Sequence, residues 1–195
     1  MRIIFIRHAE RFDRTNSFSW LYNIGTGSYI FDTPLSQNGH KLAYDKAVSF
    51  NENNIKLTKI YCSPYIRTIT TALEFAKIYS NVSVIIDPKI SEYQPLFSHN
   101  TNIAPYGIAG KFPETYHDLE TRLDDFIKMI LKTNLLTDDI LVVTHSECIR
   151  SLGSIMAKSF ETFKFDDNNI PYLSTLTLTY NSTNDMCDSV EFELN

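Results

Sequence analysis

Four places in this chain carry polar or ionisable residues directly after a short apolar run. They are Arg7-His8, the stretch from Ser63 to Arg67, Ser91-Glu92 and His145-Ser146. A neutral imidazole can attack phosphorus, guanidinium groups can bind the equatorial oxygens, and a protonated carboxyl can give a proton to the leaving oxygen. If these residues meet in one place, their types favour phosphoryl transfer.

The apolar runs before these residues alternate with helical patterns, which is typical of an α/β fold whose crossover helices cover a mostly parallel sheet. In such sheets, ligands bind at the carboxyl ends of the strands, so the four polar places are expected at one edge. Val82–Ile86 has the β-branched content of a buried strand. The expected strands are Arg2–Ile6, Lys59–Cys62, Val82–Ile86, Ile140–Thr144 and two C-terminal strands, 176–180 and 190–194, each with one solvent-facing side.

Capping residues indicate where the helices begin. Ser36 is a plausible N-cap for a helix whose apolar positions run to Phe50, and Ser63-Pro64 reads as a cap followed by proline at the first helical position. Thr115 with Asp118 resembles a capping box and starts a helix that reaches Asn134. A further helix is expected over 147–158. Two stretches, 12–33 and 96–112, show no periodic pattern and are long enough to be functional loops.

Composition limits the class of protein. With 195 residues, of which 43% are hydrophobic, the chain can bury one core, so a single domain over residues 1–195 is expected. A net charge of -5 argues against binding nucleic acid through its phosphates. No segment approaches the roughly 18 apolar residues of a membrane span, so we expect a cytoplasmic or nuclear protein without membrane association. Three widely spaced cysteines fit reduced thiols. The oligomeric state stays open.

Several motifs, taken in order along the chain, resemble the histidine phosphatase superfamily, whose members are phosphoglycerate mutase-like and whose first signature is Arg-His-Gly-Glu. The matching segments are Arg7-His8-Ala9-Glu10, Ser63-Pro64-x-x-Arg67-x-x-x-Thr71-Ala72, Glu92 and Thr144-His145. The resemblance spans nearly the whole chain and implies a three-layer α/β/α sandwich. Ala9 replaces the usual glycine; we expect this to be harmless unless the position needs a positive φ.

The resemblance also implies catalytic roles. His8 is the expected nucleophile, which forms a phosphohistidine, and Glu92 is the expected proton donor and later the base that activates water. His145 is expected to be protonated and to bind the phosphoryl group. Neither a metal nor a cofactor is implied, because arginines and a protonated His145 supply the positive charge.

Four further residues are expected to bind the substrate. The resemblance implies that Arg7 and Arg67 hold the phosphoryl oxygens and that Arg11 joins them. The backbone N–H of Ser146 stands at the start of a helix, where it favours an anion.

Within the superfamily, the segment Arg11-Phe12-Asp13 with Trp20 after it resembles the tyrosine phosphatases that suppress T-cell receptor signalling more than the glycolytic mutases. A yeast transcription-factor subunit with the same domain is also similar. Aromatic residues in the long loops and after the third strand are expected either to pack or to form a wall for an aromatic leaving group. They are Trp20, Tyr22, Tyr29, Phe31 and Tyr93.

Three functions therefore remain open. The first is a metal-independent phosphomonoesterase, a histidine acid-type phosphatase, for which phosphotyrosine and other aryl phosphates are candidate substrates. The second is a mutase or a sugar or metabolite phosphatase of the same superfamily. The third is a noncatalytic scaffold that binds phosphate. The expected partner is a phosphorylated small molecule or phosphoprotein. His40, His99 and His117 are expected to lie outside the site, with His99 a minor candidate for contact with the substrate.

Overall fold

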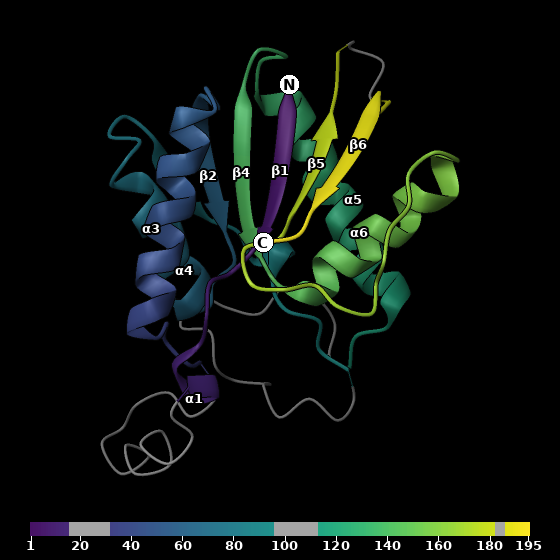
Figure 1. The fold of residues 1–195 in the computed structure, drawn as a ribbon. Coiled ribbons are helices and arrows are strands. Elements are labelled where there is room, and N and C mark those ends of the chain that lie inside the picture. Colours follow the sequence, from purple (N-terminus) through teal and green to yellow (C-terminus); the bar gives the residue numbers. More distant parts are fainter. Residues whose placement is uncertain (16–31, 96–112, 182–185) are drawn as a thin grey trace.

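A six-stranded sheet forms the centre of the molecule (Figure 1). The computed structural model describes residues 1–15, 32–95, 113–181 and 186–195. The strand order is β3-β2-β4-β1-β5-β6. Strands β3, β2, β4 and β1 run parallel, whereas β5 and β6 are antiparallel to their neighbours. The strands are β1 Arg2–Arg7, β2 Leu57–Cys62, β3 Ser83–Ile86, β4 Asp139–Thr144, β5 Thr175–Thr179 and β6 Ser189–Glu193.

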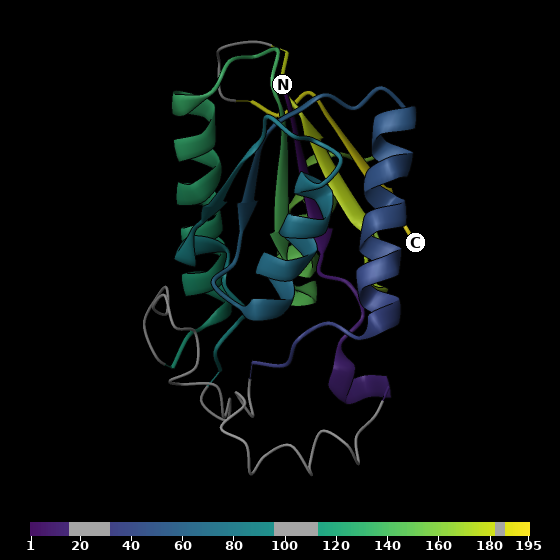
Figure 2. The same cartoon turned by 90° about the vertical axis from the view of Figure 1, so that its left-hand side faces the viewer.

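Helices cover both faces of this sheet, so the predicted three-layer α/β/α sandwich is confirmed (Figures 1 and 2). The first pair, α3 (Gln37–Glu52) and α4 (Ile66–Ala76), packs on one face, and the second pair, α5 (Tyr116–Thr133) and α6 (Ser146–Ser159), packs on the other. Two short helical segments, α1 (Phe12–Thr15) and the 3₁₀ turn η2 (Pro88–Ile90), lie between these elements.

Alternation along the central strand β1 creates the two halves of the core. Ile3 and Phe5 point into the cluster beneath α5 and α6, whereas Ile4 and Ile6 point into the cluster beneath α3 and α4. All four side chains are buried. Because these residues of β1 are apolar on both faces of the sheet, the polar residues that follow them emerge from the core only at the end of the strand.

Strands β1, β2 and β4 end at the same edge. Arg7 pairs with Thr144 and Cys62 pairs with Val143, so the residues that follow each strand emerge side by side. The backbone N–H groups of His8 and Ser63 both continue this pairing, donating to the carbonyls of Thr144 and Val143 at 3.0 and 3.1 Å. The predicted gathering of polar residues at one edge is confirmed.

Two of the predicted helix starts are confirmed and one is wrong. Ser36 Oγ accepts a hydrogen bond from the Gly39 N–H at 2.8 Å, and Thr115 forms a complete capping box with Asp118. Helix α4, however, begins at Ile66 rather than at Pro64. The Ser63 hydroxyl does not cap it, because that hydroxyl is hydrogen-bonded to the imidazole of His145.

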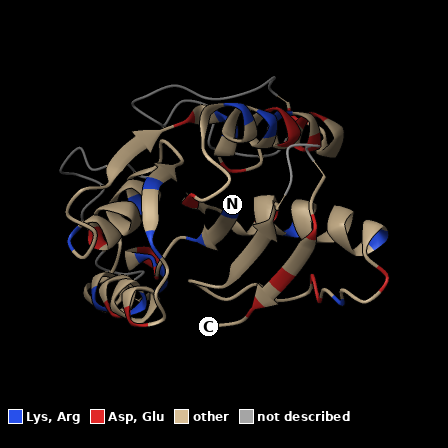
Figure 3. Cartoon of the chain, turned by 90° about the horizontal axis from the view of Figure 1, so that it is seen from above, with Lys and Arg blue, Asp and Glu red and all other residues tan. Residues whose placement is uncertain are grey.

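The strand predicted to be buried over 82–86 is an edge strand instead. β3 pairs only with β2, and its side chains are exposed or half-buried. Its β-branched residues suit any pleated surface, so they did not distinguish an edge from a centre. At the other edge, β6 keeps the predicted solvent-facing side. Its exposed Glu191 and Glu193 disfavour pairing of this edge strand with a strand of another chain (Figure 3).

Two other sequence-based expectations bear on the described residues. Cys62, Cys148 and Cys187 are free thiols, as predicted, and burial raises the pKa of Cys62 to about 12.

Among the helices that the structure describes, none combines the length and the apolar character needed to cross a bilayer.

Gly39 allows helix α3 to approach the segment that follows β1. A Cβ at this position would lie 2.3 Å from the carbonyl oxygen of Glu10, a backbone atom with little freedom to move. We expect Gly39→Ala to lower the free energy of unfolding by about 1–3 kcal/mol, the usual cost of overpacking. Urea unfolding measures this change. The exposed neighbour Gln37→Ala serves as the control, and equal stability of the two variants would contradict the close packing.

Candidate active site

His8 stands directly after β1 with its side chain buried, being 2% exposed. Its Nδ1 lies 2.8 Å from the carbonyl oxygen of Ala9, which can only accept a hydrogen bond. Nδ1 therefore carries the hydrogen, and Nε2 keeps a free lone pair. This is the tautomer that a nucleophilic imidazole needs.

The surroundings of His8 also keep it neutral. Burial lowers the pKa of His8 well below that of an ordinary histidine, and the positive charge of Arg67 lowers this pKa further. A hydrogen bond to Ala9 and the charges of Arg7 and Arg11 have smaller effects. His8 is consequently uncharged at neutral pH.

Ala9 is accommodated at its position, as predicted. It does not have a positive φ, and among the described non-glycine residues only Asn54 and Leu173 do. Its methyl group is buried in the core beneath α3 and α4, and its N–H donates to Thr71 Oγ1 at 3.1 Å. Alanine therefore replaces glycine here without backbone strain.

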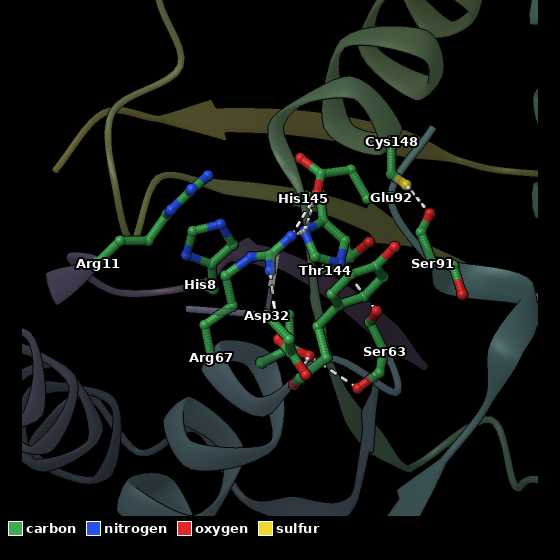
Figure 4. Close-up of polar contacts among 12 residues, drawn as sticks. His8, Arg11, Asp32, Ser63, Arg67, Ser91, Glu92, Thr144, His145 and Cys148 are labelled. Carbon is green, nitrogen blue, oxygen red and sulfur yellow. Dashed lines mark hydrogen bonds and ion pairs between the residues drawn. The ribbon is translucent and has the colours of Figure 1, made fainter. Parts of the chain in front are cut away.

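Arg67 lies at the centre of the site, only 1% exposed (Figure 4). One of its nitrogens, Nη2, donates to Glu92 Oε2 and lies 3.3 Å from His145 Nδ1. The other, Nη1, lies 3.5 Å from Asp32 Oδ1, and the plane of the guanidinium covers the Tyr65 ring at 4.3 Å. Arg67 thus connects the residues that follow three different strands.

His145 is held between Ser63 and Arg67. Its Nε2 lies 2.8 Å from Ser63 Oγ, and its Nδ1 faces Arg67, which can only donate; Nδ1 is therefore the acceptor. Burial, followed by the charge of Arg67, lowers the pKa of His145 well below the ordinary value. Beside Arg67, His145 therefore favours the neutral form, and its protonation on binding a phosphoryl group stays a prediction.

Glu92 reaches the same centre from the segment after η2, so the structure brings it together with His8, Arg67 and His145 (Figure 4). Its side chain remains 24% exposed, and its Oε2 lies 4.0 Å from His145 Nδ1. Of the residues around Arg67, it is the carboxylate with access to solvent, since Asp32 is buried.

Asp32 belongs to the site, although no role was predicted for it from the sequence. Both carboxylate oxygens accept from the N–H of Ile66, at 2.9 and 3.0 Å, so Asp32 holds the first turn of α4 as well as Arg67. Burial raises the pKa of Asp32, while the Ile66 N–H and Arg67 oppose that rise. The feature of the sequence that could have identified Asp32 is its position just before the helix start at Pro34-Leu35-Ser36.

Arg7 borders the site on the side of β1. Its Nη1 donates to the Ile170 carbonyl, and its guanidinium lies over the Tyr172 ring at 4.2 Å. The same ring lies 5.6 Å from the His8 ring, and it was not identified from the sequence. Burial lowers the pKa of Arg7. The Nε atoms of Arg7 and Arg67 are buried and have no hydrogen-bond partner within the described part of the chain, so each keeps an unused donor.

Arg11 and Ser146 are placed near the site, but no hydrogen bond or ion pair joins their side chains to the other described residues of the site. Arg11 forms a bidentate ion pair with Asp13 at 3.0 and 2.7 Å, and its side chain lies beside His8 (Figure 4). Ser146 is the first residue of α6, with His145 as the N-cap. Their roles in phosphate binding stay predictions.

Most residues expected outside the site lie outside it. His40 forms an ion pair with Glu74 at 2.8 Å, and His117 is exposed. Tyr93, which was expected either to pack or to form an aromatic wall, stacks on Tyr116 with ring centroids 4.7 Å apart. No group of three or more His, Cys, Asp or Glu residues in the described ranges is arranged to hold a metal ion. His99, Trp20, Tyr22, Tyr29 and Phe31 fall outside the described residues, as do most of the stretches 12–33 and 96–112.

Comparison with known proteins agrees with this geometry. The family model described as histidine phosphatase superfamily (branch 1) matches residues 3–191. The chain is 33% identical to an uncharacterised phosphoglycerate mutase family protein, R708, of Acanthamoeba polyphaga mimivirus. That match covers 95% of this chain and 94% of the viral protein.

Solved structures share the fold at lower identity. The ecdysone phosphate phosphatase of Bombix mori, in complex with tungstate, superposes with a TM-score of 0.67 at 15% identity and covers 92% of this chain and 89% of that chain. The mycobacterial glucosyl-3-phosphoglycerate phosphatase in complex with VO3 gives a TM-score of 0.66 at 17% identity, covering 99% and 97%.

The lowered pKa values of His8 and His145 predict a loss of stability in mild acid. Both groups bind a proton more readily in the unfolded chain, so the free energy of unfolding falls once the pH drops below about 6.5, the ordinary histidine pKa. For each group, the free energy of unfolding falls by at most about 1.4 kcal/mol per pH unit. Urea unfolding at pH 7.5 and 5.5 measures this loss.

His8→Asn and His145→Gln should each reduce that pH dependence, because each removes one of the buried imidazoles. Exposed His117→Ala should leave it unchanged. If the wild-type protein is equally stable at both pH values, the two imidazoles are not held neutral by the fold.

Proposed function

Because the chain belongs to the histidine phosphatase superfamily, we propose that it is a phosphomonoesterase whose nucleophile is His8. The observation that carries the proposal is the state of this imidazole. Its Nδ1 is engaged by the Ala9 carbonyl, its Nε2 is free, and its pKa is lowered by burial and by Arg67. A histidine kept only for structure has no need of a neutral ring beside buried guanidinium groups.

The first step transfers the phosphoryl group to His8. The Nε2 lone pair forms an N–P bond while the bond from phosphorus to the ester oxygen breaks, and that oxygen takes a proton from Glu92. Water then attacks phosphorus, the N–P bond breaks, and Glu92 takes the proton from the water. Inorganic phosphate leaves, and the starting imidazole is restored.

Positive charge for the transferring group comes from Arg7 and Arg67. Their buried Nε atoms have no hydrogen-bond partner among the residues that the structure describes and suit the anionic phosphoryl oxygens. His145 is neutral beside Arg67, and a phosphate dianion would favour its protonated form. The reaction we propose therefore uses protein groups and no metal ion.

For the substrate, we propose aryl phosphates, including phosphotyrosine. A half-buried aromatic ring borders the proposed nucleophile: the ring of Tyr172 lies 5.6 Å from that of His8. The segment Arg11-Phe12-Asp13 resembles the tyrosine phosphatases that suppress T-cell receptor signalling. Relatives named as phosphatases of ecdysone phosphate and glucosyl-3-phosphoglycerate keep a metabolite substrate as the second candidate. We further propose that the protein acts in the cytoplasm.

His8→Ala should reduce the turnover of p-nitrophenyl phosphate by more than about 10³-fold, since the variant lacks the nucleophile. Acid quench of the wild-type reaction should trap an acid-labile phosphoenzyme that is missing from the variant. His117→Ala, a histidine away from the site, is the matched control. Wild-type turnover in His8→Ala would refute the mechanism. Phosphate binding without turnover in the wild type would favour a noncatalytic scaffold.

A substrate panel tests the proposed specificity. We expect kcat/KM to be at least about tenfold higher for phosphotyrosine peptides and phenyl phosphate than for phosphoglycerates and sugar phosphates. The reason is that each aromatic contact contributes about 0.5–1.5 kcal/mol. The assays are run with and without EDTA. A preference for phosphoglycerates or sugar phosphates would assign the protein to the metabolite phosphatases or mutases instead.

A further inference from the structure

The segment that carries Glu92 lies between η2 and residue 95 and has neither helix nor strand to hold it. Its backbone carbonyls are instead held by groups from other elements. Arg122 Nη1 donates to the carbonyl of Lys89 at 2.6 Å, and Arg122 Nη2 lies 3.4 Å from that of Glu92. Between them, Thr144 Oγ1 donates to the carbonyl of Ile90 and Cys148 Sγ to that of Ser91, at 2.8 and 3.2 Å.

Arg122 is itself fixed by a buried ion pair. Its Nε and Nη2 donate to the two oxygens of Glu114 at 2.5 and 3.1 Å, and the two side chains are only 8% and 1% exposed. Arg122 extends from α5 between Leu119 and Leu123, whose side chains are buried in the core. The orientation of the guanidinium is therefore set by a rigid helix and by a carboxylate.

Glu114 holds the far end of the same segment. Its Oε2 accepts from the N–H of Gln94 at 3.0 Å, and its own N–H donates to the Gln94 carbonyl at 2.8 Å. The Glu114–Arg122 pair thus binds the backbone on both sides of Glu92, at residues 89 and 94. Glu92 stands in the middle of a stretch whose two ends are attached to one ion pair.

We propose that the Glu114–Arg122 pair positions Glu92 for proton transfer to the leaving oxygen. This inference rests on the proposed function. Proton transfer requires the donor within hydrogen-bond reach of the oxygen, and an error of about 1 Å can reduce the rate by about a hundredfold. Arg122 acts through the backbone of Glu92, to whose carbonyl it donates, so it is a positioning residue.

Stability alone does not account for this arrangement. A buried ion pair is often no more stabilising than apolar side chains of similar volume, because both charges must be desolvated. An apolar pair, however, cannot donate hydrogen bonds to the two carbonyls of the segment that carries Glu92. The planar fork of arginine reaches Glu114, Lys89 and Glu92 together, and a lysine ammonium lacks that geometry.

The test uses Arg122→Lys, which keeps a positive charge next to Glu114 but loses the fork. p-Nitrophenol is the stronger acid and departs without a proton, whereas phenol needs one from Glu92. We therefore expect kcat/KM to fall by about tenfold or more for phenyl phosphate and by much less for p-nitrophenyl phosphate. Glu92→Gln is the benchmark and should show the same selectivity, with a larger loss of about a hundredfold.

Arg2→Lys is the matched control. Arg2 forms a bidentate ion pair with Asp139 at the opposite end of β1, so its replacement should leave both substrates unaffected. Circular dichroism confirms folding, and the double variant Glu114→Gln/Arg122→Gln, which leaves no unpaired buried charge, replaces Arg122→Lys if that variant unfolds.

Equal losses for the two phosphates, or no loss, would overturn the inference while Glu92→Gln stays selective. If Glu92→Gln itself shows no selectivity, the assignment of Glu92 as the acid fails, and the inference falls with it. These results separate the failure of the positioning role from that of the proposed function.

Discussion

A buried guanidinium, that of Arg67, is the group on which the rest of the site depends. Removing a cation from water is costly, and the structure offsets this cost with the carboxylates of Asp32 and Glu92 and with the face of Tyr65. The same charge lowers the pKa values of His8 and His145. One residue at the start of α4 therefore contacts the segment that carries Glu92, and it also keeps both imidazoles neutral. Its position in the first turn of α4 would otherwise be unfavourable, since a cation there opposes the helix dipole.

The framework of this site follows from local patterns in the sequence. Apolar runs and alternating patterns predicted all six strands to within two residues, and the carboxyl ends of parallel strands must share an edge. His8, Arg67 and His145 were found because each stands at such an end. The edge position of β3 and the later start of α4 were missed, because both depend on neighbours that no local pattern records. Ser63 shows this most clearly: its hydroxyl could cap a helix but is bound to His145 instead.

Residues that approach the site from outside these strand ends were harder to find. Tyr172 reaches Arg7 and His8 from the segment before β5, where Leu173 has a φ of 62° although it is not a glycine. Such strain persists only where surrounding contacts impose it. The N–H of Leu173 donates to the Arg7 carbonyl at 3.1 Å, and the Arg7 side chain donates to Ile170. This turn is thus held against the end of β1 by contacts between residues far apart in the sequence.

The two carboxylates on Arg67 differ in a way that suits a reaction cycle. Asp32 is 1% exposed at its side chain and is also bound to the Ile66 N–H, so it is a permanent partner. Glu92 is 24% exposed and can be displaced by an anion that enters from solvent. An arriving phosphate would take over the guanidinium, and its negative charge would favour protonation of the displaced carboxyl. Substrate binding would then convert Glu92 from the counter-ion of Arg67 into the acid that the leaving oxygen needs, while Asp32 keeps Arg67 in place.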